Sequence, residues 1–196
     1  MKTKTEILSI PTLNEDVLEI QIEGISPLVV NKNHFTVSGE DGVKSGKVDR
    51  NPELEFQNSI HWIDQSTGRS GFPARGFKAA CVTAGQLLKK KDYQKAKVRG
   101  AFFIPDEFVE INGTPKKRHD VVRLNGRTPD NRYRAEYWPW TATIRLSFSS
   151  SILSIEQILQ LFAESGAKVG IGEDRPEKGG TWGRFKLVSA KRFTGA

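Results

Sequence analysis

Two stretches of this sequence place apolar residues at helical spacing, and each is flanked by stretches that alternate like β-strands. Residues 17–23 (VLEIQIE) and 141–148 (TATIRLSF) alternate apolar and polar side chains, as half-buried strands do. The helical stretches follow them at 71–88 and 155–162, and residues 182–188 indicate a last strand. Two β–helix–β passes in one chain predict an α+β fold, an antiparallel sheet with helices on one face.

The two helices have different sequence signals. In the first, Pro73 suits the first turn, and one helical face carries Phe77, Cys81, Ala84 and Leu88. In the second, Ser154 and Gln157 form an S-x-x-Q capping box, and Ile155, Ile158, Leu159 and Phe162 share a face. Gly166 is a natural stop for that helix.

The order of these elements favours a ferredoxin-like sandwich, the architecture that RNA-recognition modules also use. We expect one domain over residues 1–196, with a mobile loop at about 31–57 and an insertion at about 105–140.

Shorter patterns complete the expected strand order. We predict strands at 58–63, 98–104 and 167–172. Residues 108–113 end in Asn-Gly and predict a hairpin with a return strand at 120–124. Residues 125–140 show no clear period and predict an irregular, basic and aromatic segment.

The charge of the chain is uneven. The net charge is +7 over 196 residues, yet residues 1–60 hold 6 Lys and Arg against 10 Asp and Glu. The excess of positive charge therefore lies after residue 60. Such asymmetry favours a polyanionic partner, although a basic surface that only aids solubility has the same composition.

One segment combines basic and aromatic residues as a single-strand binder requires. Cations neutralise phosphates, and aromatic faces stack on unpaired bases at ~1–3 kcal/mol per base. The basic residues are Lys116, Lys117, Arg118, Arg123, Arg127, Arg132 and Arg134, and the aromatic ones are Tyr133, Tyr137, Trp138 and Trp140. The alternative is that Trp138 and Trp140 fill the core beside Pro139. Phe102 and Phe103 pose the same choice between core and stacking platform.

A second candidate segment is glycine-rich, GIGEDRPEKGGTWGRF at 170–185. Its glycines are Gly170, Gly172, Gly179, Gly180 and Gly183, and its cations are Arg175, Lys178 and Arg184. Either the glycines bring the backbone close to a sugar-phosphate chain, or they form a tight structural connection. No helical pattern follows the loop, which excludes a P-loop or a dinucleotide fingerprint.

Signs of catalysis are weaker. Candidates are His34 and His119 as acid and base, and Asp41 and Asp49 in the long loop. The histidines lack zinc-site spacing, and the single cysteine, Cys81, excludes an intrachain disulfide and a cysteine-based zinc site. We therefore expect binding rather than catalysis, with no metal and no cofactor.

Two segments resemble the RAMP superfamily, specifically the backbone subunits of CRISPR effector complexes. In IHWIDQSTGRSGFPARGFKAACVTAG (60–85), Phe72, Pro73, Ala74, Phe77 and Lys78 follow a motif that opens the first helix of those proteins. Arg75 and Gly76 stand where the family usually has a serine. The glycine-rich loop is the second segment. The chain also looks similar to short phage and prophage proteins with a GIGEWRPE-like loop.

The resemblance implies an RNA-recognition-like core and binding of single-stranded RNA, or of DNA, with Arg75 and Lys78 among the contacts. It also implies partners, namely further copies along the strand or CRISPR effector components. No membrane partner is expected, and the expected location is the cytoplasm, that of a bacterial host if the protein is phage-encoded. A ribonuclease and a phage protein that blocks a host CRISPR complex remain alternatives.

Overall fold

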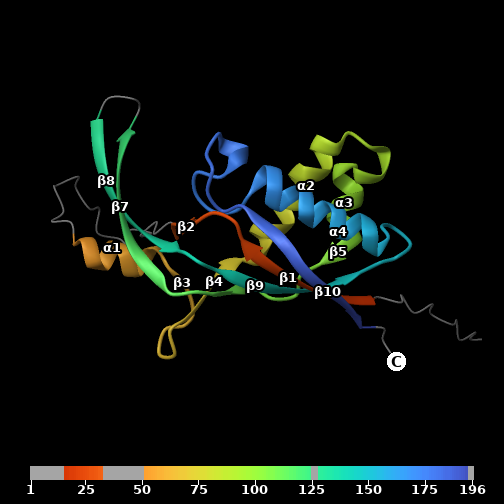
Figure 1. The fold of residues 1–196 in the computed structure, drawn as a ribbon, viewed down its shortest axis with the longest axis horizontal. Helices are drawn as coiled ribbons and strands as arrows, with labels where there is room; N and C mark the ends of the chain where they lie inside the picture. The colour runs from red at the N-terminus through yellow and green to blue at the C-terminus, as the bar shows by residue number, and fades with distance from the viewer. Residues whose placement is uncertain (1–15, 33–50, 125–127, 194–196) are drawn as a thin grey trace, which may run out of the picture.

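The computed structural model describes residues 16–32, 51–124 and 128–193. Two antiparallel sheets dominate it, and Figure 1 shows helices covering one face of the larger sheet. The strands are β1 (Asp16–Gly24), β2 (Leu28–Val30), β3 (His61–Asp64), β4 (Arg69–Pro73), β5 (Phe102–Phe103), β6 (Phe108–Asn112), β7 (Pro115–Leu124), β8 (Thr128–Tyr137), β9 (Thr141–Phe148) and β10 (Phe185–Phe193). The helices are α1 (Pro52–Ser59), α2 (Ala74–Leu88), α3 (Lys95–Ala101) and α4 (Ile155–Glu164), with short helical turns η1 (Lys91–Tyr93), η2 (Ser165–Val169) and η3 (Pro176–Lys178).

The larger sheet has the order β10-β1-β9-β6-β4-β3, and β5 also pairs with β9. The helix α2 lies between β1 and β6 in the chain, and α4 lies between β9 and β10. A sheet in which the first strand lies between the third and the last, with two helices on one face, is the split βαβ arrangement. The predicted ferredoxin-like α+β core is therefore confirmed.

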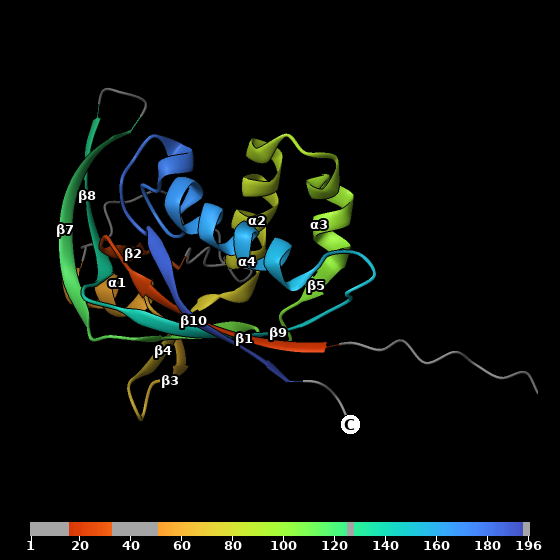
Figure 2. The ribbon, with the colours of Figure 1, turned by 45° about the vertical axis from the view of Figure 1, so that its right-hand side comes forward.

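The core lies between this sheet and the helices α2 and α4 (Figures 1 and 2). Ile20 of β1 is directly opposite Ile144 of β9, and both side chains are fully buried. The predicted helical faces meet them, because Phe77, Cys81 and Phe162 are also fully buried. Alternation on the strands and helical spacing on the helices therefore identified the two sides of one core.

The capping box of α4 is confirmed. Ser154 Oγ accepts a hydrogen bond from the backbone N–H of Gln157 at 3.3 Å, and Gln157 Oε1 accepts one from the N–H of Ser154 at 2.9 Å. The helix does not stop at Gly166, since the turn η2 continues it to Val169.

A second, smaller sheet forms from β2, β8 and β7 in that order. The strands β7 and β8 make a long antiparallel hairpin that rises beside the helical layer and away from the larger sheet (Figures 1 and 2). The helix α1 packs against it, with the N–H of Ala135 donating to Ser59 Oγ at 2.8 Å.

Several short predictions were wrong. Residues 125–140 hold the regular strand β8, and β7 pairs with β8 rather than with β6. The Asn-Gly hairpin does not form because β6 already has neighbours on both sides, β4 and β9.

Three of the predicted strands contain helical residues. Within 98–104, Val98, Ala101 and Phe102 are buried, which is helical spacing, and α3 extends to Ala101. A short apolar run is compatible with a strand or a helix, so the spacing of its apolar residues does not distinguish the two. Before the strand at 61, the α1 helix begins after Asn51, whose side chain accepts from the N–H groups of Glu53 and Leu54. The sequence NPE is a helix-start signal, because Asn51 caps the helix and Pro52 stands at its first position. Residues 167–172 form a helical turn and a loop, not a strand.

The cap of α4 allows a stability test. We expect Ser154→Ala to lower the free energy of unfolding by ~1 kcal/mol, because it removes the acceptor for an otherwise unpaired N–H group. Urea denaturation followed by circular dichroism would measure this. The exposed Ser150→Ala is the matched control, and equal stability of the two variants would contradict the prediction.

Candidate nucleic-acid interface

The glycine-rich loop folds against the segment that connects β1 to β2. The N–H of Glu173 donates to the carbonyl of Val29 at 2.8 Å, and the N–H of Gly183 donates to the carbonyl of Pro27 at 2.7 Å. The loop also closes on itself, with Ile171 N–H bonded to the carbonyl of Gly183 at 3.0 Å. These bonds hold the loop against β2, through Val29, and against the residue that precedes β2, Pro27.

Two of its glycines are required by this packing. Gly183 has φ +64°, and a Cβ atom there would lie 1.7 Å from the carbonyl oxygen of Ile171. Gly172 has φ +79°, and its Cβ would lie 2.5 Å from the carbonyl oxygen of Val29. Only glycine fits such positions. Close approach at these two glycines is therefore to the protein's own backbone, which favours the structural interpretation of the loop.

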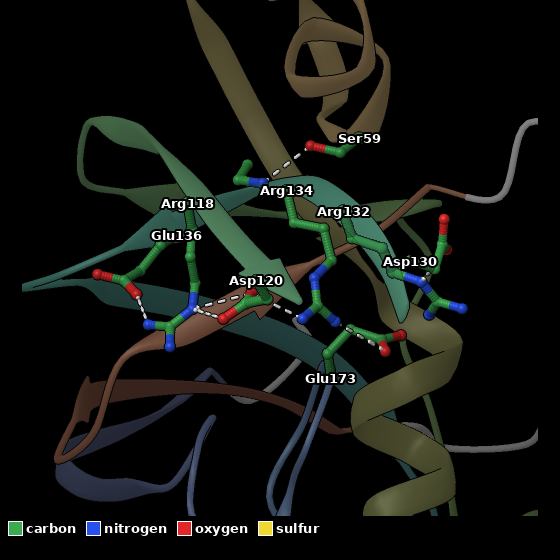
Figure 3. A network of polar contacts seen from close by, with 9 residues as sticks. Ser59, Arg118, Asp120, Asp130, Arg132, Arg134, Glu136 and Glu173 are labelled. Carbon is green, nitrogen blue, oxygen red and sulfur yellow. Dashed lines mark hydrogen bonds and ion pairs between the residues drawn. The ribbon is translucent and has the colours of Figure 1, made fainter. Parts of the chain in front are cut away.

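Ion pairs join the same loop to the β7–β8 hairpin (Figure 3). Arg134 of β8 contacts Asp120 of β7, with 2.7 Å between Nη2 and Oδ2, and reaches Glu173 of the loop, with 3.4 Å between Nη1 and Oε2. Arg118 bonds the same Asp120 at 2.9 Å and also pairs with Glu136. We call these five residues the hairpin clamp.

The side chains of the hairpin clamp are partly or fully buried, so breaking their ion pairs would destabilise the fold. The Arg134 side chain is only 7% exposed, and within the described structure its Nε has no hydrogen-bond partner. Burial alone would lower the pKa of Arg118, but hydrogen bonds to Glu136 and Asp120 outweigh it and raise that pKa. The Arg118 guanidinium also lies 4.1 Å from the centre of the Trp182 ring. Partly buried ion pairs thus hold the hairpin against the loop.

Next to the loop lies a groove of about 870 Å³. Its walls are the end of β2, the start of α2, residues 103–108, and the glycine-rich loop from Gly170 to Glu177. The two segments that resemble the RAMP superfamily therefore meet in one concave site, although about a hundred residues separate them.

Four cations line the groove, and Arg175 is the one that forms an ion pair among the described residues, with Glu177. Lys32 and Arg75 are exposed, and neither has an ion-pair partner among the described residues. Lys78 is half-buried, donates to the carbonyl of Phe102, and lies 5.9 Å from the centre of the Phe103 ring. Its burial lowers the pKa of Lys78.

Carboxylates also line the groove, but two are already neutralised. Glu173 is paired with Arg134, and Glu177 accepts hydrogen bonds from Arg175 at 2.6 Å and from Thr83 Oγ1 at 3.1 Å. Asp106 and Glu107 remain, so three cations without ion pairs face two exposed carboxylates. The positive excess is small and lies near α2 and the end of β2.

The other expected phosphate ligands have varied surroundings. Lys116, Arg123 and Lys178 are exposed. Lys117 pairs with Glu53 at 2.9 Å, Arg132 pairs with Asp130 at 3.3 Å, and Arg184 Nε donates to the carbonyl of Ala167 at 3.1 Å. Arg127 lies outside the described residues. The arginines of the hairpin clamp, Arg118 and Arg134, are engaged within the protein.

The aromatic candidates divide in the same way. Tyr137 and Trp140 are in the core, where Trp140 Nε1 donates to the carbonyl of Ser26 at 2.9 Å. Tyr133 stacks on His119 with 4.7 Å between ring centres. Trp138 is 43% exposed and Phe103 is 60% exposed, while Phe102 is buried. Stacking on bases is therefore open to Trp138 and Phe103.

The catalytic candidates do not come together in the described part of the chain. His119 is exposed on the hairpin, with its Nε2 2.8 Å from Asn131 Oδ1. His34, Asp41 and Asp49 lie outside the described residues. Within 16–32, 51–124 and 128–193, no three His, Cys, Asp or Glu side chains are grouped to hold a metal ion.

Two features of the site were not anticipated. Lys32 was read only as part of a loop, and it follows a three-residue strand too short to show a period. The second feature is the pairing of Arg118 and Arg134 with the carboxylates of the hairpin clamp. Alternation of charged residues in RHDVVR and DNRYRAE (118–123 and 130–136) was a signal for paired strands with a charged inner face.

The glycine-rich loop predicts a difference between two equivalent substitutions. Gly183→Ala should lower the free energy of unfolding by more than ~3 kcal/mol, because strain and a backbone clash combine. Gly179→Ala has the same strain, with φ +84°, but open space around the Cβ, and should cost only ~1 kcal/mol. Thermal and urea denaturation would compare them. Equal losses would show that the loop does not pack as described.

The hairpin clamp predicts a second difference. Asp120→Ala leaves Arg134 and Arg118 without their shared carboxylate and should cost ~3 kcal/mol or more. Asp130→Ala removes the partner of the more exposed Arg132 and should cost under ~1 kcal/mol. Hydrogen exchange would also show faster exchange of the amides of β7 and β8 in the first variant only. Equal exchange in both would contradict the clamp.

Comparisons with known proteins agree with the fold. No protein-family model matches the sequence, and no curated protein gives a significant match. The structure matches a chain of the type III-B Cmr-beta bound to cognate target RNA with a TM-score of 0.51 at 11% identity, covering 92% of this chain and 61% of that one. The crystal structure of Cmr6 from Pyrococcus furiosus matches with a TM-score of 0.46 at 10% identity, covering 89% of this chain and 98% of that one.

The match to the Cmr-beta chain shows a similar architecture. The chain spans about three fifths of the length of the Cmr-beta chain it matches. Similarity to phage proteins stays a prediction. Among the described residues, none of the helices has the length and apolarity to cross a bilayer. The fold that the expected resemblance implies is confirmed by the likeness to the Cmr-beta chain.

Proposed function

We propose that this protein binds single-stranded RNA in the groove between α2 and the glycine-rich loop, as a subunit of a CRISPR-type effector assembly. The observation that carries the proposal is the groove itself, in which two distant sequence motifs meet and Lys32 and Arg75 face solvent without ion-pair partners among the described residues. The fold of a Cmr-beta chain, from a structure bound to target RNA, supports the same role.

The groove offers what an unpaired strand requires. Lys32 and Arg75 supply exposed positive charge for phosphates. Phe103 at the rim presents an aromatic face that is 60% exposed, on which one base stacks. Asp106 and Glu107 on the same wall repel phosphates, so the backbone runs along the α2 side and the bases face residues 103–108.

The hairpin extends the binding surface. Lys116 and Arg123 are exposed on β7, and the hairpin clamp holds β7 and β8 next to the loop that lines the groove. We assign phosphate contacts to these exposed cations. Arg118 and Arg134 position the hairpin, because their guanidinium groups are committed to carboxylates.

The groove cations predict a loss of affinity with a salt signature. We expect Lys32→Ala and Arg75→Ala each to weaken binding of a labelled oligouridylate about tenfold, equivalent to ~1.4 kcal/mol. Each should also reduce the slope of log K against log salt by about 0.7, since one phosphate contact is lost. Fluorescence anisotropy at several salt concentrations measures both quantities.

Charge-matched controls lie on β10, away from the groove. Lys191→Ala and Arg192→Ala remove the same charges from exposed positions of that strand. Equal losses in controls and groove variants would show that only net charge matters. No binding of the wild-type protein at low salt would overturn the proposed function.

The finer properties follow from the same site. Because the contacts assigned above are to phosphates and to one base face, we expect little sequence preference and somewhat tighter binding of RNA than of DNA. We expect the RNA to be bound intact, and copies of the chain to line up on long strands. Gel analysis after incubation with magnesium and light scattering with long RNA test these expectations.

A further inference from the structure

A second basic surface lies at the other end of α2. It consists of six exposed cations in residues 89–99, which we call the lysine shelf: Lys89, Lys90, Lys91, Lys95, Lys97 and Arg99. The shelf spans the end of α2, the turn η1 and the helix α3. These elements form the end of the helical layer that is remote from the β7–β8 hairpin (Figures 1 and 2).

The charge of the shelf is almost uncompensated. Asp92 is the one carboxylate in residues 89–99, and its Oδ1 lies 3.8 Å from Lys97 Nζ. The other five cations have no ion-pair partner among the described residues. Lys95 and Arg99 also lie four residues apart on α3, where like charges repel. Folding therefore places these cations close together, and all but Lys97 have no ion pair among the described residues to offset their mutual repulsion.

The shelf is held on a packed support. Tyr93 is buried and its hydroxyl donates to Gln160 Oε1 of α4 at 2.6 Å. Val98 is also fully buried beneath α3. Lys89 has φ 53° at the end of α2, a left-handed position that favours glycine. The cations are thus displayed by ordered backbone, one of them at a strained position.

Its position along α2 relates the shelf to the groove. Arg75 and Lys89 are fourteen residues apart, and at ~1.5 Å per helical residue the separation is ~21 Å. A strand stacked as in a duplex advances ~3.4 Å per nucleotide along its axis and covers that distance in about six nucleotides, whereas a more extended strand needs fewer. A single-stranded RNA that fills the groove and continues along α2 would reach the lysines.

We propose that the lysine shelf is a second phosphate-binding site, which holds the part of the RNA strand that leaves the groove. This inference rests on the proposed function and adds a longer footprint to it. A nucleic-acid backbone suits the shelf better than a lipid surface, because the aromatic residue of the segment, Tyr93, points into the core and is not available to enter a membrane interface.

The test compares short and long RNA. Labelled oligouridylates of about 3 and about 20 nucleotides, lengths that stay within the groove or extend past α2, are titrated at several salt concentrations. The variant is Lys90→Gln, Lys91→Gln and Lys95→Gln combined. We expect about tenfold weaker binding of the long RNA, a salt slope smaller by about 2, and unchanged binding of the short RNA.

Two control proteins accompany it. Replacing the same three lysines by arginine should restore binding of the long RNA, because positive charge is retained. Replacing the exposed Lys168, Lys186 and Lys191 by glutamine removes equal charge elsewhere and should leave the wild-type preference for long RNA. All substituted positions are exposed, so thermal denaturation should show the same stability for each protein.

The outcomes separate the two proposals. If the short RNA binds and depends on Arg75, but the shelf variant binds long RNA as tightly as wild type, the shelf inference is wrong and the proposed function stands. Binding to phosphatidylserine vesicles that depends on the shelf, with unchanged binding of long RNA, would also overturn it. If neither RNA binds the wild-type protein, both proposals fail.

Discussion

The buried contact of Arg134 with Asp120 and Glu173 is the interaction on which the arrangement of the site depends. It joins β8, β7 and the glycine-rich loop through one side chain. The loop in turn lines the groove, and it is bonded to Val29 of β2 and to Pro27 just before that strand. The guanidinium group of Arg134 therefore joins the hairpin to the groove wall, and the pairing of β8 with β2 and the backbone bonds of the loop support the same arrangement.

The sequence predicted the core well and the hairpin poorly, for one physical reason. Where burial is apolar, as at Ile20, Ile144 and Phe77, periodicity reports it directly. The inner face of the hairpin is buried through charges, so Arg118 and Arg134 looked like free phosphate ligands. Charged side chains are usually exposed, so an alternating pattern of charges does not reveal burial where these side chains pair with each other.

The candidate site was only partly predictable. The motif that opens α2 and the glycine-rich loop identified two walls of the groove, including Arg75 and Lys78. Lys32 and residues 103–108 join them only through tertiary packing, which no local pattern reports. The function of the glycines also became clear only in three dimensions: at Gly183 and Gly172 the nearby atoms are the chain's own carbonyl oxygens.

The charged inner face of the hairpin has a consequence for how the arm can move. A hairpin that packed on the loop through apolar side chains would expose an apolar patch when it separated, and such patches promote aggregation. Here the face that would be uncovered carries Arg118, Asp120, Arg134 and Glu136, all of which water solvates well. Separation of the hairpin from the glycine-rich loop would therefore break ion pairs and expose a charged face, while Ala135 and Tyr137 at the base of β8 are held in the core beside β2.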